Sequence, residues 1–107
     1  MINFSKKYPI VGSFYYHYKH DDQKSLNNYS YKIIGIAVHS ETEEILVAYQ
    51  PLYRPNHVFD YEANFNVRPL DMFLENVIYG DYSGARFRLI TDEKTIAELN
   101  KLDFTQI

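Results

Sequence analysis

The chain has 107 residues, which is enough for one domain with one hydrophobic core. Its 14 acidic and 11 basic residues give a formal net charge of −3, which argues against a general nucleic-acid binder, because such proteins usually carry a basic excess. The absence of cysteine excludes disulfides, thiolate nucleophiles and cysteine-based metal sites.

The first half of the chain reads as three strands. Aromatic side chains alternate along residues 13–20, with Phe14, Tyr16 and Tyr18 on one face and Tyr15, His17 and Lys19 on the other. This period of two predicts a strand, and the polar stretch 21–28 predicts a loop. Residues 29–39 are apolar on both faces at their centre, which predicts a strand covered on both sides.

A hairpin is expected next, because the polar break at 40–43 separates strand 29–39 from a third apolar run at 44–53. So short a connection forces antiparallel pairing, and without glycine it favours a four-residue loop around a type I turn. If His39 faces Glu44, the register places Gly35 opposite Ala48, Ala37 opposite Leu46, Ile36 opposite Val47 and Ile34 opposite Tyr49.

The second half is less regular. We expect an irregular excursion over 54–63, a short strand over 64–67 and a single helical turn from Pro69, with Met72 and Phe73 anchored inward. Residues 79–84 predict a turn and 85–91 a last strand. A helix over 92–102 follows, with Thr91 as its cap and an apolar stripe formed by Ile96, Leu99 and Leu102.

These elements predict a mostly β fold: a small, strongly bent, SH3-like five-stranded barrel with a short helical turn and a C-terminal helix over one opening or face. Closing a barrel removes the exposed edges of short strands. No linker stands out, so residues 1–107 are expected to form one domain. Residues 1–7 lack the apolar stretch of a signal peptide, and no apolar run approaches a membrane span, so a cytoplasmic protein without membrane contact is expected.

The arginines and lysines give the clearest indication of a binding site. Arg68 precedes a proline, which favours extended backbone, and Arg86 and Arg88 share a predicted strand face. Together with Lys19 or Lys32 they could form a small pocket for a carboxylate or phosphate. The alternative is that Arg68 pairs with Glu75 or another acid and clamps the barrel.

The histidines give weaker signals. His17 and His20 are three apart on a predicted strand and so face opposite sides, and the four histidines (17, 20, 39 and 57) lack the spacing of a zinc site. His39, Ser40 and Glu41 are hydrolase-like residue types, but adjacent side chains diverge, so they do not make a triad. No glycine-rich phosphate loop is present, and we expect no metal and no cofactor.

Several segments together resemble a known family. They are Gly12, Tyr16-His17-Tyr18-Lys19, Tyr31, Ala37-x-His39-Ser40-Glu41-Thr42, Val47-x-Tyr49, Leu52-Tyr53, Val67-Arg68-Pro69-Leu70-x-Met72-Phe73 and Arg86-Phe87. Over roughly residues 8–90 the chain resembles the bacterial domain of unknown function family 1653. The resemblance implies a stand-alone small β domain with no established activity and no catalytic residues to carry over. Segments 56–65 and 21–28 look longer than is usual for the family.

The leading hypothesis is a non-catalytic binding module for a nucleotide, a single-stranded nucleic acid or another anionic ligand. Its candidate ligand-binding residues are His17, Lys19, His39, Ser40, Glu41 and Arg68. One alternative is a protein–protein adaptor or homodimerising module that docks through an aromatic patch. The other is a small hydrolase using His39 or His17 with Glu41, which requires these groups to converge in a cleft.

Overall fold

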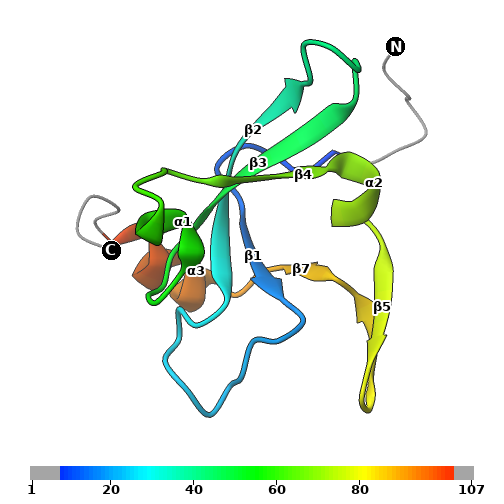
Figure 1. Cartoon of the computed structure of the whole chain (residues 1–107). Coiled ribbons are helices and arrows are strands. Elements are labelled where there is room, and N and C mark those ends of the chain that lie inside the picture. The colour runs from blue at the N-terminus through cyan, green and yellow to red at the C-terminus, as the bar shows by residue number, and fades with distance from the viewer. Residues whose placement is uncertain (1–7, 103–107) are drawn as a thin grey trace.

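The computed structural model describes residues 8–102, and its main unit is an antiparallel sheet of five strands (Figure 1). In spatial order these are β4 (Asn66–Pro69), β3 (Ile45–Pro51), β2 (Ser30–Val38), β1 (Phe14–His17) and β7 (Phe87–Leu89). A separate hairpin consists of β5 (Asn76–Tyr79) and β6 (Tyr82–Ala85), and the helices are α1 (His57–Asp60), α2 (Leu70–Phe73) and α3 (Glu93–Asn100). The prediction of a mostly β fold is confirmed. Residues 1–7, in which we expected no signal peptide, lie outside the described residues.

The sheet is open, so the expected closed SH3-like barrel is not confirmed. Within residues 8–102 no pairing joins β4 to β7, and these two strands form the edges. The chain between them is taken up by α2 and by the β5–β6 hairpin, which extends away from the sheet (Figure 1). The edge strands have only four and three residues, and such short edges limit unwanted strand pairing without closure.

The β2–β3 hairpin follows the predicted register over most of its length. The amide of His39 donates to the carbonyl of Glu44 at 2.8 Å. Gly35 faces Ala48, and Ala37 and Ile36 face Leu46 and Val47, as expected. The predicted pairing of Ile34 with Tyr49 is wrong, because a bulge between Ile33 and Gly35 places Ile33 opposite Tyr49. The bulge lets both of these side chains enter the core, where Ile33 is fully buried.

The β5–β6 hairpin occupies a segment that the sequence predicted only as a turn over 79–84. Tyr79 pairs with Tyr82, and Gly80 begins the two-residue turn between them with φ of 58°, a backbone conformation that glycine adopts without strain. Neither strand has a buried residue, and β5 presents mostly exposed side chains, among them Ile78. With no buried face, they lack the hydrophobic alternation from which strands are recognised.

The hydrophobic core has two parts, one centred on Phe73 and Phe87 and the other on Leu52 and Leu99. In α2 the buried side chains are Leu70 and Phe73, three residues apart on one helical face. The prediction that Met72 is anchored inward is wrong, since Met72 is 42% exposed. This exposure places the Met72 side chain beside the pocket described below.

Helix α3 confirms the predicted packing of its apolar stripe. Leu99 is buried against Phe14, Leu52 and Ile90, and Ile96 and Leu102 pack partly buried on the same cluster. The cap is Asp92 rather than Thr91, because its carboxylate accepts the amide of Thr95 at 2.9 Å. In residues 8–102 no helix has the length and apolar character needed to cross a bilayer.

Candidate functional site

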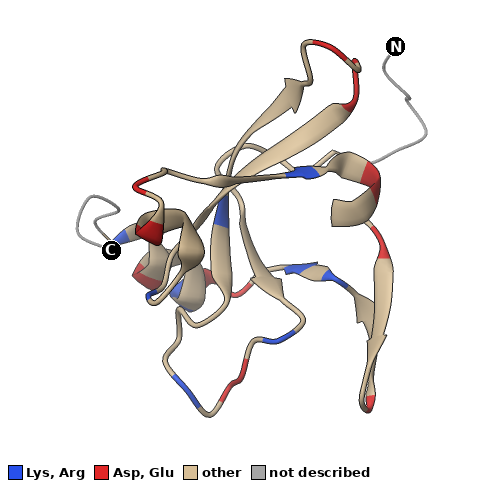
Figure 2. Cartoon of the chain, in the orientation of Figure 1, with Lys and Arg blue, Asp and Glu red and all other residues tan. Residues whose placement is uncertain are grey.

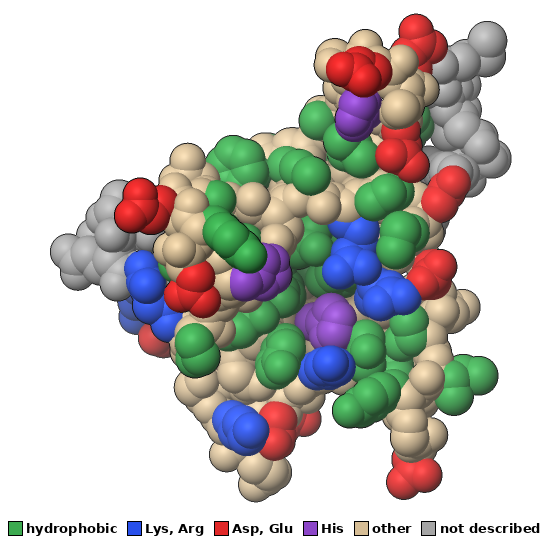
Figure 3. Space-filling view, in the orientation of Figure 1, with side chains coloured by type: hydrophobic (Ala, Val, Ile, Leu, Met, Phe, Trp, Pro, Cys, Tyr) green, Lys and Arg blue, Asp and Glu red, His purple; other side chains and the backbone are tan. Residues whose placement is uncertain are grey.

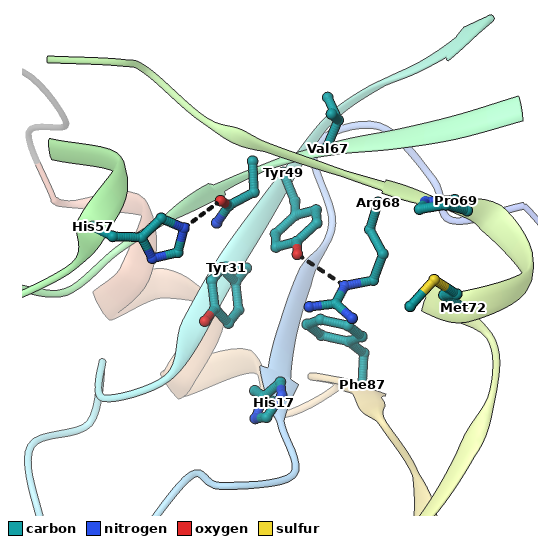
Figure 4. A pocket seen from close by; sticks show the side chains of 10 residues that line it. His17, Tyr31, Tyr49, His57, Val67, Arg68, Pro69, Met72 and Phe87 are labelled. Atoms are coloured by element: carbon teal, nitrogen blue, oxygen red, sulfur yellow. Dashed lines mark hydrogen bonds between the residues drawn. The ribbon is translucent and has the colours of Figure 1, made fainter. Parts of the chain in front are cut away.

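A pocket of about 300 Å³ opens where β4, α2 and β7 meet the aromatic face of the sheet (Figure 4). We call it the Arg68 pocket. It is lined by His17, Tyr31, Tyr49, His57, Asn66, Val67, Arg68, Pro69, Met72 and Phe87. The lining comes from seven elements that the open sheet brings together, β1, β2, β3, α1, β4, α2 and β7.

Arg68 is the central cation of this pocket. On β4 it faces Val47 of β3, and strand alternation turns it toward the aromatic face while Val67 is exposed outside. Its Nε donates to the hydroxyl of Tyr49 at 3.1 Å, and its guanidinium carbon lies 5.6 Å from the centre of the Phe87 ring (Figure 4). A cation above a ring face is attracted by the ring quadrupole. Arg68 is therefore held in place by two aromatic side chains.

Glu75, which the sequence analysis considered as a partner for Arg68, pairs with a different residue. Glu75 forms an ion pair with Arg86, whose backbone amide also donates to the Glu75 carbonyl at 2.9 Å. Among residues 8–102, no ion pair involves Arg68. The alternative in which Arg68 serves as a salt-bridge clamp to Glu75 is thus wrong, and its positive charge faces the pocket.

In Figure 4, His17 is drawn below the Phe87 ring and Arg68 above it. It makes an edge contact with Phe87 at 5.3 Å and lies close to Tyr18 and Tyr29, with ring centres 4.2 and 5.7 Å away. Its Nδ1 accepts the backbone amide of Lys19 at 3.2 Å. Burial first, and then the positive charges of Arg68, Lys19 and Arg86, lower the pKa of His17 to about 4. His17 is therefore neutral at physiological pH.

The other predicted cations lie differently. Lys19 is exposed at the rim, with its Nζ 5.6 Å from the centre of the Tyr79 ring. Arg88 is exposed on β7, and neither Arg88 nor Arg86 lines the pocket, so the expected grouping of these two arginines around the anion site is not found there. Lys32 lies over the ring of Phe14, in the other part of the core. Lys and Arg side chains nevertheless gather around a histidine in the middle of the face shown in Figure 3.

His39, Ser40 and Glu41 are not brought to this pocket. All three are exposed at the tip of the β2–β3 hairpin, a tip rich in acidic residues (Figure 2). The Nδ1 of His39 accepts the amides of Glu41 and Thr42 at 3.1 and 3.2 Å, so this histidine shapes the loop. The convergence that a hydrolase would need is absent among residues 8–102, and the same residues contain no cluster able to hold a metal ion.

The sequence analysis did not identify Tyr49, Phe87, Met72 or the pair of His57 and Asn66 as parts of a site. An amide oxygen only accepts, so the Nε2 of His57 donates to the Oδ1 of Asn66, 3.0 Å away. Phe87 faces His17 in the β1–β7 register. A correct pairing of the first and last strands would have placed Phe87 beside His17, but the remote contact between β1 and β7 leaves no local pattern in the sequence.

Tyrosine hydroxyls extend the polar edge of the site. The hydroxyls of Tyr31 and Tyr53 lie 2.6 Å apart, and Tyr31 packs edge-on against Tyr49 and Phe87. Burial, followed by the interaction with Tyr53, raises the pKa of Tyr31 well above its ordinary value. Tyr31 is thus a neutral wall of the pocket at any physiological pH.

A family model and a solved structure both relate the chain to the same family. A family model described as a protein of unknown function, DUF1653, matches residues 13–89. The chain is also similar to the crystal structure of a protein of that family from Bordetella bronchiseptica, with 28% sequence identity and a TM-score of 0.57. The alignment covers 78% of this chain and 95% of the other. No curated protein matches the chain.

Proposed function

The chain belongs to the DUF1653 family, whose function is unknown, and we propose that this chain is a non-catalytic binding module for a small anionic ligand held at Arg68. One observation carries the proposal. Arg68 turns a positive charge toward a pocket, two aromatic side chains fix it there, and no acid among residues 8–102 neutralises it. Arginine is the side chain best suited to planar anions, because its guanidinium presents donors in a fixed fork.

The size of the pocket favours a small ligand. Its volume of about 300 Å³ is at the lower end of the range typical of ligand pockets, about 300–1,000 Å³. Among the ligands that the sequence admitted, a small organic anion fits this volume better than a nucleotide or a stretch of single-stranded nucleic acid. The positions of Lys19 at the rim and His17 inside support the predicted roles of these two residues, whereas His39, Ser40 and Glu41 have no place in the proposal.

A ligand screen by thermal unfolding tests the proposal. Small anions that bind the native chain should raise its melting temperature, and at a concentration of one hundred times Kd the stabilisation is about 2.7 kcal/mol. Arg68→Ala should abolish the shift, whereas the matched control Arg88→Ala, which removes an exposed arginine outside the pocket, should retain it. A shift of equal size in both variants would show that binding does not use Arg68.

A docking role is the second candidate, and one observation favours it. The β5–β6 hairpin extends from the sheet and exposes Ile78, which is 84% accessible, next to the exposed Tyr79. Exposed apolar side chains on the two faces of this projecting hairpin are candidate contacts for a partner or a second copy of the chain. Sedimentation equilibrium distinguishes the two arrangements: a homodimer that dissociates in Ile78→Ser supports this role, and a monomer at all concentrations counts against self-association.

A further inference from the structure

The free hydrogen-bonding groups of Arg68 itself are donors. The Nε of Arg68 is already used by the Tyr49 hydroxyl, so the edge that remains is the pair of terminal Nη atoms. No other hydrogen bond of Arg68 is formed within residues 8–102. A planar anion can therefore approach the fork end-on and bind both Nη atoms at once.

Two other residues that line the pocket have donors available. Tyr49 is 3% exposed, and its hydroxyl oxygen accepts from Arg68, while no acceptor for the hydroxyl hydrogen exists among residues 8–102. A buried donor without a partner costs free energy, which a ligand oxygen would recover. In His17 the Nδ1 lone pair is used by the Lys19 amide, so the ring hydrogen of the neutral imidazole is on Nε2, which is a donor as well.

Arg68 is the one Lys or Arg side chain among the residues that line the pocket. Arg86 is paired with Glu75, Lys19 is exposed at the rim, and His17 is neutral because its pKa lies near 4. A phosphate monoester, which carries close to two negative charges at neutral pH, would bring one charge more than Arg68 balances. A carboxylate brings one charge and two acceptor oxygens in a plane, which matches the end-on fork.

The rest of the lining is part apolar and part polar, since His57 and Asn66 also belong to it. Pro69 and Met72 lie beside the Arg68 fork, and the Phe87 ring lies beneath it (Figure 4). We propose that the ligand of this pocket is a small monocarboxylate with an apolar or aromatic body, its carboxylate bound end-on by Arg68 and its body packed against Met72 and Phe87. This inference rests on the proposed function and specifies its ligand class. A free organic acid and the C-terminus of a peptide share this chemistry.

Three ligands that share a phenyl group but differ in their polar group test which polar group the wild-type chain prefers. They are 3-phenylpropanoate, its neutral amide 3-phenylpropanamide and 2-phenylethyl phosphate, compared by isothermal titration calorimetry at pH 7.5. We expect the carboxylate to bind at least about tenfold more tightly than either of the others, because the amide has no charge for Arg68 to pair with and the phosphate brings one charge more than Arg68 balances. Tighter binding of the phosphate overturns this inference and leaves the proposed anion-binding function standing. Failure of every anion to bind overturns both.

A pair of conservative variants tests the role of the fork. Arg68→Lys keeps the charge but loses the planar pair of donors, so the carboxylate affinity should fall about tenfold, while Arg88→Lys should leave it unchanged. Equal affinities in wild type and Arg68→Lys, with both chains folded by circular dichroism, overturn the end-on geometry. If Arg68→Lys does not fold, Tyr49→Phe replaces it: this variant keeps the ring and loses the hydroxyl donor, and the inference predicts weaker carboxylate binding.

A last pair of ligands tests whether the carboxylate belongs to a peptide C-terminus or to a free organic acid. N-acetyl-alanyl-phenylalanine is compared with its C-terminal amide, and the free acid should bind while the amide should not. Binding tighter than that of 3-phenylpropanoate identifies a peptide C-terminus as the preferred source, and weaker binding identifies a free acid; both results support the shared carboxylate chemistry. Equal binding of the peptide acid and its amide overturns it.

Discussion

The neutral His17 makes the stability of the fold sensitive to mild acid. Its pKa is lowered from 6.5 to about 4, so between these values the unfolded chain binds a proton that the folded chain does not. The free energy of unfolding should therefore fall as the pH decreases from about 6.5, and this contribution should level off below about 4. At 1.36 kcal/mol for each pKa unit the upper limit is about 3 kcal/mol. His17 is only half-buried, so solvent screening reduces the expected effect to about 1–2 kcal/mol.

Replacement by asparagine isolates this contribution. In His17→Asn the amide oxygen can accept the Lys19 amide in place of Nδ1, but the side chain does not titrate. Urea unfolding at several pH values between 7.5 and 4.5 should show a smaller loss of stability for His17→Asn than for wild type. His39→Asn is the matched control, because the Nδ1 of His39 also accepts an amide two residues ahead but lies on an exposed loop. It should keep the wild-type slope. Parallel curves for wild type and His17→Asn would refute the reasoning.

Three further predictions concern the fold and catalysis. Leu99→Ala should lower the free energy of unfolding by about 2–5 kcal/mol in urea titrations, because Leu99 is fully buried. The control Leu89→Ala should have little effect, because Leu89 is exposed, and equal effects of the two substitutions would contradict the assigned core. Asn56→Ala should cost about 0.5–2 kcal/mol in the same assay, since the Asn56 side chain caps α1 by accepting the Val58 amide at 2.9 Å, and an unchanged stability would count against this cap. Assays with esters, phosphoesters and nucleotides should show no turnover above background, and activity in wild type that disappears in a folded double variant, His17→Ala with His39→Ala, would overturn the non-catalytic proposal.

The first three strands and their hairpin could be predicted, because short stretches of sequence are enough to indicate them. Alternating aromatic side chains located β1, apolar runs located β2 and β3, and the polar break fixed the hairpin at His39 and Glu44. The bulge at Ile34 was not predictable from alternation, since it depends on which of two neighbouring isoleucines the core accepts. Closure of the sheet was also beyond local signals, because it depends on whether two short edge strands, distant in sequence, meet.

The candidate site divides in the same way. Arg68 could be singled out because it is a cation before a proline in an apolar context, and His17 because it interrupts a run of tyrosines. Their common surroundings could not be foreseen, since Tyr49 and Phe87 reach the pocket only through pairing across the sheet. Conversely, His39 and Glu41 are only two positions apart in sequence, but a hairpin tip keeps them exposed and away from the other candidates.

The most direct test of the central claim is a crystal structure of the chain with 3-phenylpropanoate. We expect the two carboxylate oxygens to lie about 2.7–2.9 Å from the two Nη atoms of Arg68, with the phenyl ring against Met72 and Phe87. An acid bound elsewhere with the Nη edge of Arg68 empty would contradict the claim. So would a carboxylate of the chain itself bound at that edge.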